Sequence, residues 1–411
     1  MIEEQYYDSD LHKASPPSST SCYLQSTQSV LDLATTSNNK MVAEPRSAIT
    51  THRSVEVLAS KLRRRQIVGS RATALETLLV LRQVISKARF SNLEQLVAII
   101  RDAGRRLVDA QPKEHSVGNT VRKVLHHIRE EVHAATRGNE PAKPTSFSIS
   151  KFVLQGQPRK QVVLQKSEVK GTLRENDPDD PDSFARGLKP VLMEAIQDVL
   201  DELETVYDNI SKNAKDHIHS DEIVLTLGVS KTVEQFLKSA AHVRNYSVIV
   251  AETAPSYDGR QMAESLSSFG ISTFLVPDSS IFALMSRVNK VILGAHVILA
   301  NGGMFAISGS LMAATAARAH STPVVVCAGQ FKVTPLWNLY HEYGALDFGN
   351  PSDVLGFENG DLVDKVDVVN PYYDYVQPEL IVAYITNDGD HPPSSIYRLL
   401  KETYDDEDND L

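Results

Sequence analysis

A loop of glycines and small polar residues is the segment of this chain best suited to binding a ligand. An alanine-rich stretch that favours a helix follows it, at Leu311–Ala319. The backbone N–H groups of a glycine-rich turn and the positive end of a helix dipole together attract an anion such as a phosphate. The sequence therefore predicts a phosphate-binding cradle. Its residues are Asn301, Gly302, Gly303, Ser308, Gly309 and Ser310.

This cradle has no charged side chain with which to do chemistry. Between Ala300 and Arg318 the sequence contains no Lys, Arg, Asp or Glu. Acid–base catalysis needs a positioned pair of proton donor and acceptor. The segment is therefore typical of a binding scaffold derived from an enzyme, rather than of an active site.

Short apolar runs around the cradle predict the strands that position it. Most are uninterrupted rather than alternating, which indicates a parallel sheet that is covered on both faces. Ligands of such sheets lie at the carboxyl ends of the strands. The predicted strands are Glu222–Leu227, Tyr246–Ala251, Ser272–Val276, Lys290–Leu293, Val297–Ala300 and Pro323–Cys327. The helices predicted between them are Lys231–Ala241, Arg260–Ser268, Ser279–Ser286 and Leu311–Ala319.

Helical spacing dominates the part of the chain before this sheet. Leu93, Leu96 and Ile100 recur at helical intervals, and Ser91 and Glu94 form a capping-box signature in front of them. Four short helices are expected up to residue 137, and a long amphipathic helix precedes the first strand. The predicted fold class is α/β, with an N-terminal helical bundle, a long connecting helix and a doubly wound, mostly parallel Rossmann-like sheet domain.

This organisation divides the chain into six predicted parts. Two of them are polar and lack sustained periodicity, so we expect a disordered tail and a flexible insertion. The parts are the N-terminal tail (1–50), a basic helical domain (51–137), the insertion (138–185), the connecting helix (186–219), the Rossmann-like domain (220–404) and an acidic tail (405–411).

Charge is distributed unevenly between these parts. Residues 51–137 contain 17 Lys+Arg and 8 Asp+Glu, a net charge of +9, whereas the whole chain carries −10 and the remainder therefore −19. The chain ends with the acidic run Asp405, Asp406, Glu407 and Asp408. Two interpretations stay open at this point. The charges form either a solvated surface with a frayed tail, or a docking face for an acidic protein or RNA.

The sequence disfavours several classes of protein and site. No apolar run reaches the ~18 residues of a membrane span, and the polar, acidic start of the chain is unlike a signal peptide. The two cysteines, Cys22 and Cys327, are not expected to pair, which favours a reducing, cytoplasmic location. His217 and His219 have metal-like spacing, but too few further ligands lie nearby for zinc. We therefore expect no metal and no cofactor.

Several long segments, in a fixed order, carry a resemblance to a known family. They resemble the regulatory-subunit family of eukaryotic translation initiation factor 2B, which is related to ribose-1,5-bisphosphate and methylthioribose-1-phosphate isomerases. The segments MSRVNKV, FKVTPLW and IYRLLKETY are most similar to the beta branch of that family. The main matching segments are Ile223–Ser230 (IVLTLGVS), Ala251–Gly259 (AETAPSYDG), Ser286–Gly294 (SRVNKVILG), Ala300–Ser310 (ANGGMFAISGS), His320–Lys332 (HSTPVVVCAGQFK) and Asp374–Leu380 (DYVQPEL).

The chain departs from the isomerases at the positions that would do their chemistry. Gly228 stands where the resemblance places a catalytic Cys, and His296 where it places a catalytic Asp. Ala254 replaces a phosphate-binding Arg, and Ala306–Ile307 replaces an Asn-Lys pair. A glycine cannot move a proton through a side chain, and a lone His beside a strand is more often a packed structural residue. The resemblance therefore implies no catalytic residue and no enzyme activity, and it disfavours a surviving isomerase.

The resemblance implies a regulatory subunit of the guanine nucleotide exchange factor for translation initiation factor 2, in the integrated stress response. Its expected partners are the alpha, gamma, delta and epsilon subunits of the same factor, in a decamer. Initiation factor 2 itself, through its alpha subunit, is a further expected partner, and the regulatory core senses phosphorylation of that subunit. No DNA and no membrane is expected. The alternative is a degenerate sugar-phosphate or nucleotide-binding sensor.

Two sets of residues are candidates for these contacts. Val191 and His219 are expected at a subunit interface, because in the family this region packs against a delta-like subunit. Basic residues of the helical domain are expected to hold an acidic or phosphorylated surface, since Arg suits bidentate phosphate contacts. The candidates are Arg101, Arg105, Arg106, Arg122 and Lys123.

Overall fold

A computed structural model describes residues 46–137, 182–337 and 347–411. The predicted N-terminal tail and insertion lie outside these residues except at their ends. There, helices already run over residues 46–50 and 182–185. The other domain boundaries stay predictions.

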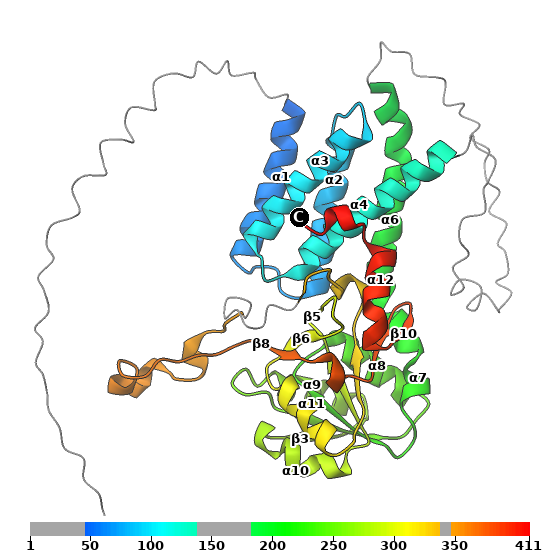
Figure 1. Ribbon diagram of the computed structural model, residues 1–411. Helices are drawn as coiled ribbons and strands as arrows, with labels where there is room; N and C mark the ends of the chain where they lie inside the picture. The colour runs from blue at the N-terminus through cyan, green and yellow to red at the C-terminus, as the bar shows by residue number, and fades with distance from the viewer. Residues whose placement is uncertain (1–45, 138–181, 338–346) are drawn as a thin grey trace, which may run out of the picture. The chain divides into compact units, whose positions relative to one another are not determined.

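Five long helices form the N-terminal part of the described fold (Figure 1). Each of the four predicted helices spans 18 residues or more, so they are longer than expected. The capping box lies one residue later than predicted, because Asn92 rather than Ser91 accepts the Gln95 N–H, at 2.9 Å. The helices are α1 (Arg46–Arg63), α2 (Ser70–Lys87), α3 (Leu93–Ala110), α4 (His115–Arg137) and α6 (Asp182–Lys212).

A seven-stranded sheet forms the second part, in the order β10-β9-β7-β4-β1-β2-β3. Every pair of neighbours is parallel except β9 and β10 at one edge, which confirms the predicted mostly parallel sheet. The central strands are buried continuously, as their uninterrupted apolar runs require. The strands are β1 (Ile223–Leu227), β2 (Ser247–Ala251), β3 (Ser272–Val276), β4 (Lys290–Gly294), β7 (Val324–Cys327), β9 (Ala383–Thr386) and β10 (Gly389–His391).

A small antiparallel sheet, in the order β5-β6-β8, was not predicted. It contains β5 (Val297–Ile298), β6 (Met304–Ile307) and β8 (Tyr373–Val376). β6 runs through the middle of the predicted glycine loop. The predicted run Val297–Ala300 therefore belongs to this sheet and not to the parallel one.

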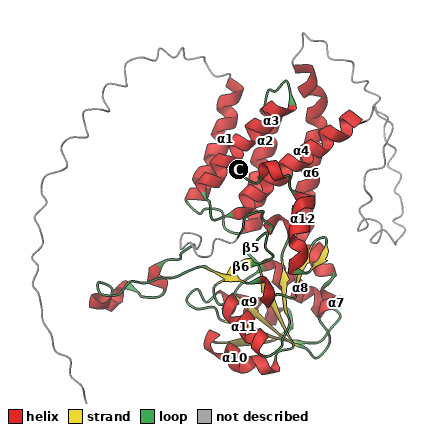
Figure 2. Ribbon diagram, in the orientation of Figure 1, coloured by secondary structure: helices red, strands yellow, loops and turns green. Residues whose placement is uncertain are grey.

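Shorter helices cover the parallel sheet, as Figure 2 shows in red around the yellow strands. α8 keeps its predicted bounds, whereas the predicted helix Ser279–Ser286 is a short α-helix between two 3₁₀ turns. The helices are α7 (Ala214–His217), α8 (Lys231–Ala241), α9 (Asp258–Ser268), α10 (Ile281–Leu284), α11 (Ser310–Ala319) and α12 (Ile396–Thr403).

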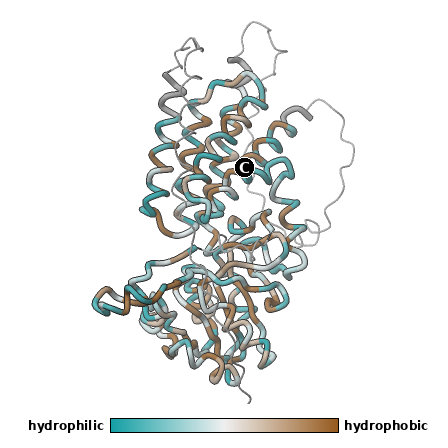
Figure 3. The backbone as a smooth tube through the Cα atoms, turned by 60° about the vertical axis from the view of Figure 1, so that its left-hand side comes forward, coloured by the Kyte–Doolittle hydropathy of each residue, from teal (hydrophilic) through white to brown (hydrophobic). Residues whose placement is uncertain are grey.

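The connecting helix α6 joins the bundle to the sheet through a shared apolar core. Its buried residues Leu192 and Val206 belong to the same hydrophobic cluster as Leu125 of α4 and as Val248 and Ile292 of the sheet. A second cluster covers the opposite sheet face and includes alanines of α11. Figure 3 shows hydrophobic and hydrophilic residues alternating along the bundle helices, as amphipathic helices require. The central strands are thus covered on both faces, whereas the edge strand β3 is partly exposed. One core fixes the bundle to the sheet.

Candidate functional site

The carboxyl end of β1 carries no side chain that could react. Gly228 follows this strand with φ +57°, in the left-handed region that favours glycine. A Cβ at this position would stand 2.7 Å from Cδ1 of Ile307 and 3.5 Å from Oγ1 of Thr253. Ile307 therefore occupies the space that a longer side chain at residue 228 would need.

His296 is a packed residue between the bundle and the sheet. Its ring stacks on Tyr373, with centroids 4.2 Å apart and planes at 13°. Burial lowers the pKa of His296, and its Nε2 lies 3.3 Å from the Lys113 carbonyl oxygen in the loop between α3 and α4. A neutral imidazole with its proton on Nε2 can donate to that oxygen. The contact links the bundle to the small sheet.

The predicted cradle is split into two groups by β6. At one end, the Asn301 amide donates to the Tyr375 hydroxyl (2.8 Å), and its oxygen accepts the Gly303 N–H (3.0 Å). At the other end lie Ser308, Gly309 and Ser310. A four-residue strand spans about 13 Å, so the six residues do not form one ligand loop. This corrects the predicted site.

Carboxylates of the chain itself occupy the backbone N–H groups that would attract an anion. Asp374 accepts the N–H of Gly309 at 2.6 Å and that of Leu311 at 3.3 Å, at the start of α11. Asp278 does the same after β2, where it accepts the N–H of Thr253 at 2.9 Å and that of Ala254 at 2.6 Å. Two negative charges thus stand at the strand ends where a phosphate would bind. The geometry supports neither isomerase chemistry nor phosphate binding there.

The predicted basic face is not one exposed surface. Arg122 and Lys123 are buried, so their assignment to an accessible face is wrong. Lys123 Nζ lies 2.5 Å from Glu202 Oε2 of α6, and Arg122 Nε donates to the Asp408 carbonyl oxygen at 3.0 Å. Both side chains are therefore engaged within the chain, Lys123 by a carboxylate of α6 and Arg122 by a carbonyl oxygen of the chain end.

The acidic chain end lies against α3 and α4, so the expectation of a frayed tail is wrong. Asp408 is fully buried, with its carboxylate 2.7 Å from Nη2 of Arg101 and 2.5 Å from Nη1 of Arg129. Asp405 lies 2.5 Å from Arg129. We call the set Arg101, Arg129, Asp405 and Asp408 the C-terminal latch. The hydrogen bonds that Arg129 donates to Asp408 and Asp405 raise its pKa, so it stays charged.

Arg129 was missed in the sequence, although a signal was present. Arg122 and Arg129 are seven residues apart, so they share one face of α4. That face meets the only strongly acidic run near the chain end. The remaining candidates, Arg105 and Arg106, lie on α3. Arg105 is exposed, whereas the half-buried Arg106 contacts His52 and lies 3.0 Å from Asp102.

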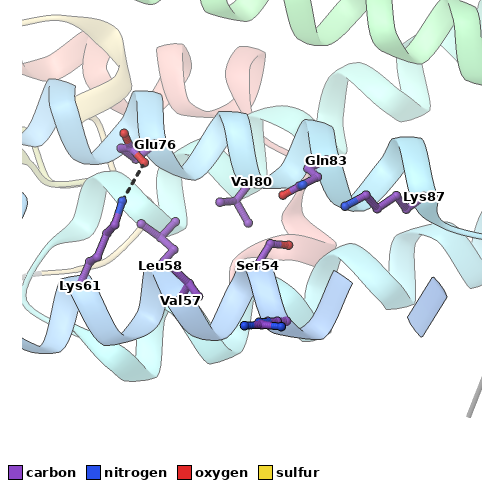
Figure 4. A pocket seen from close by; sticks show the side chains of 9 residues that line it. Ser54, Val57, Leu58, Lys61, Glu76, Val80, Gln83 and Lys87 are labelled. Carbon is purple, nitrogen blue, oxygen red and sulfur yellow. Dashed lines mark ion pairs between the residues drawn. The ribbon is translucent and has the colours of Figure 1, made fainter. Parts of the chain in front are cut away.

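A hollow of about 460 Å³ lies beside the latch and is lined by Arg105. Arg101, Arg129 and Glu407 also line it, so its wall has charges of both signs. A second hollow, of about 440 Å³, lies between α1 and α2 (Figure 4). Its Lys61 and Glu76 form an ion pair at 3.9 Å, and none of the predicted site residues lines it. The first hollow is therefore the better candidate for a contact.

Val191 and His219 are not brought together. Val191 lies near the start of α6, half-buried, and His219 is exposed beyond α7. About 30 Å of helix separates Val191 from the end of α6. Each would serve a different part of an interface.

The described residues offer no metal site and no membrane-spanning helix. No group of three or more His, Cys, Asp or Glu among them could hold a metal ion. Of the described helices, none is long and apolar enough to cross a membrane. Cys327 is buried, which raises the pKa of its thiol and keeps it protonated.

Comparison with known proteins identifies relatives along most of the chain. The model of the "Initiation factor 2 subunit family" matches residues 66–393. "Translation initiation factor eIF2B subunit beta" of Schizosaccharomyces pombe is 39% identical over 381 residues, which cover 86% of this chain and 96% of the relative. The crystal structure of eIF2B beta from Chaetomium thermophilum has a TM-score of 0.66 at 29% identity, covering 87% of this chain and 94% of that one. The tetrameric eIF2B-beta2-delta2 complex from C. thermophilum gives a TM-score of 0.62 at 27% identity, covering 86% of this chain and 95% of that one.

Asp408→Asn is expected to lower the free energy of unfolding by about 3 kcal/mol. The amide keeps the shape of the side chain but removes the buried carboxylate that pairs with Arg101 and Arg129, so that Asp405 alone remains beside Arg129. Breaking a buried pair on one side is costly. Urea unfolding measures the change. Glu407→Gln is the control, since that side chain is 79% exposed and should change stability by less than about 0.5 kcal/mol. Equal losses in the two variants would contradict a buried latch.

Lowering the pH from 7 to 5 is expected to destabilise the chain through His115. Burial, with smaller contributions from the charges of His296, Arg122 and Lys113, lowers the pKa of His115 to about 4. In the unfolded chain His115 is protonated below about pH 6.5, whereas in the folded chain it stays neutral down to about pH 4. Stability therefore falls as the pH drops through that window, by roughly 3 kcal/mol in full.

Urea unfolding of the wild type and of His115→Gln at pH 7 and pH 5 isolates this contribution. The variant is expected to lose less stability on acidification than the wild type, because its side chain has no proton to take up. Identical pH dependence in both proteins would show that His115 does not titrate between the folded and unfolded states.

Proposed function

The chain belongs to the initiation factor 2 subunit family, and from this we propose that it is the beta-type regulatory subunit of the guanine nucleotide exchange factor for initiation factor 2. The observation that carries the proposal is the similarity to two beta subunits over more than 80% of this chain and more than 90% of each relative. The protein would act in the cytoplasm.

The closed strand ends support a role without catalysis. Gly228 has no side chain, His296 is packed against Tyr373, and the amides that would hold a phosphate bind Asp374 and Asp278. In this proposal the gamma and epsilon subunits carry out the exchange, and this chain holds the assembly together. The alternative, a sugar-phosphate or nucleotide sensor, is disfavoured by the same two carboxylates.

Partners follow from the similarity. A related beta chain was crystallised with delta in a tetramer of two copies each. We therefore propose that this chain pairs with a delta-type subunit in an assembly that also holds alpha, gamma and epsilon subunits. It would also contact the alpha subunit of initiation factor 2 and help to sense its phosphorylation.

The accessibility of the five basic candidates narrows the choice of contact site for initiation factor 2. Arg122 and Lys123 are buried, and Arg101 is held by Asp408. Arg105 and Arg106 on α3 keep the most accessible guanidinium groups of the five candidates. The proposed contact is therefore the hollow beside the latch, which Arg105 lines.

Arg105→Glu combined with Arg106→Glu is expected to weaken binding of the assembled complex to initiation factor 2 roughly tenfold at low salt. Charges at the rim of an interface mainly change the association rate and its salt dependence. Complexes that contain the tagged chain are purified from host cytosol, and their native mass is measured. Binding of these complexes to initiation factor 2 is then measured by biolayer interferometry at two salt concentrations. Lys231→Glu, an exposed charge reversal on α8, is the control.

The two readouts separate the two parts of the proposal. Recovery of four other subunits with the wild type supports the exchange-factor assembly, and a lone homodimer would overturn it. If the double variant assembles and binds with unchanged affinity at low salt, Arg105 and Arg106 are not the contact.

A further inference from the structure

We propose that residues 348–369, which we call the arm, dock onto an apolar depression with a basic rim on a different protein subunit. The arm leaves and rejoins the fold at β8 (Figure 1, orange). At its base, Phe348 pairs with Pro371, and the Gly349 N–H donates to the Asn370 carbonyl oxygen at 2.7 Å. Asp347 beside this base lies 2.7 Å from Arg65, which follows α1.

The arm has a defined backbone but no core of its own. Two 3₁₀ segments, Pro351–Asp353 and Phe357–Leu362, give it regular turns. Not one of residues 348–369 is buried. Among the described residues, the hydrogen bonds of 351–369 all run within the arm. Nothing in the described fold therefore covers it.

Large apolar side chains line this uncovered segment. Phe357 is 80% exposed, and Val354, Leu362, Val366 and Val369 are each between 46% and 57% exposed. Single exposed apolar residues are ordinary on a protein surface, but a group of five on one extension marks an interaction site. An exposed aromatic anchor among aliphatic neighbours fits a pocket on a partner.

Charge selects the kind of partner. The arm contains Asp353, Glu358, Asp361, Asp364 and Asp367 against one base, Lys365, a net charge of −4. This charge repels nucleic acids and anionic membranes, so the partner is a protein with a basic rim. A second copy fits less well, because the chain outside residues 51–137 is strongly acidic and four basic residues within 51–137 are engaged by the chain itself.

The partner that binds the arm is therefore a different subunit. The choice of a delta-type subunit rests on the proposed function. The probe is the purified delta subunit of the same exchange factor, and the full chain is used throughout. The apolar variant is Phe357→Ser combined with Val366→Ser. The charge variant is Asp361→Lys combined with Asp364→Lys. The control is Val68→Ser, 83% exposed in the turn after α1.

The apolar variant is expected to bind delta at least about 30-fold more weakly, mainly through faster dissociation. The charge variant is expected to associate more slowly at low salt and to approach wild-type behaviour at high salt. Thermal midpoints of the isolated chains should not change, because no arm residue is buried. Val68→Ser should bind as the wild type does.

Each other outcome overturns the proposal in a distinguishable way. If the wild type binds delta and the arm variants bind equally well, the arm is not a docking surface, while the proposed function stands. Failure of the wild type to bind delta overturns both. A wild-type homodimer that only the arm variants lose would make a second copy the occupant. A lower thermal midpoint in the arm variants would show that the chain itself covers the arm.

Discussion

The buried carboxylate of Asp408 between Arg101 and Arg129 is the polar contact on which the position of the chain end depends, in a fold whose two halves share the core around α6. It holds the last residues of the chain, which come after the sheet in sequence, against α3 and α4 of the N-terminal bundle. Burying the Asp408 carboxylate beside two partly exposed arginines is not in itself a large gain, because desolvation offsets much of the attraction. Removing one partner is costly, however, so the latch specifies one position for the chain end. Tyr404 adds to this fit, since its buried hydroxyl donates to the Val333 carbonyl oxygen at 3.0 Å.

The strand ends show how a scaffold suited to catalysis can serve packing instead. At the positions where an enzyme would keep reactive groups free, this chain satisfies each group internally. Ile307 fills the space over Gly228, His296 stacks on Tyr373, and Asp374 holds the amides that start α11. These contacts also link the bundle, the parallel sheet and the small sheet. Rigidity of this kind suits a subunit whose proposed role is to hold others in place.

The sequence predicted what local patterning controls. β1, β2, β4 and β7 differ from their predicted bounds by one residue, because buried parallel strands are short uninterrupted apolar runs. β3 has its predicted bounds although it is a partly exposed edge strand. β6 was missed, because a run of only four residues close to glycines is too short to show the hydrophobic periodicity that distinguishes a strand from a loop. The latch was missed for another reason. Arg101 and Asp408 are 307 residues apart, and sequence gives the sign of a charge but not its partner.

Because many charged side chains pair within the chain, the net charge of each part overstates the charge that is available to a partner. Residues 51–137 carry +9, but Arg101, Arg122, Lys123 and Arg129 are engaged by the chain's own acidic groups or carbonyls. The basic field left for a partner is therefore smaller and centred on α3. The arm carries the opposite sign and lies on the other half of the fold, at β8. Two surfaces of opposite charge on separate elements favour two different partners. In the proposed function, the acidic arm would bind another subunit of the assembly, and the basic surface on α3 would bind the substrate.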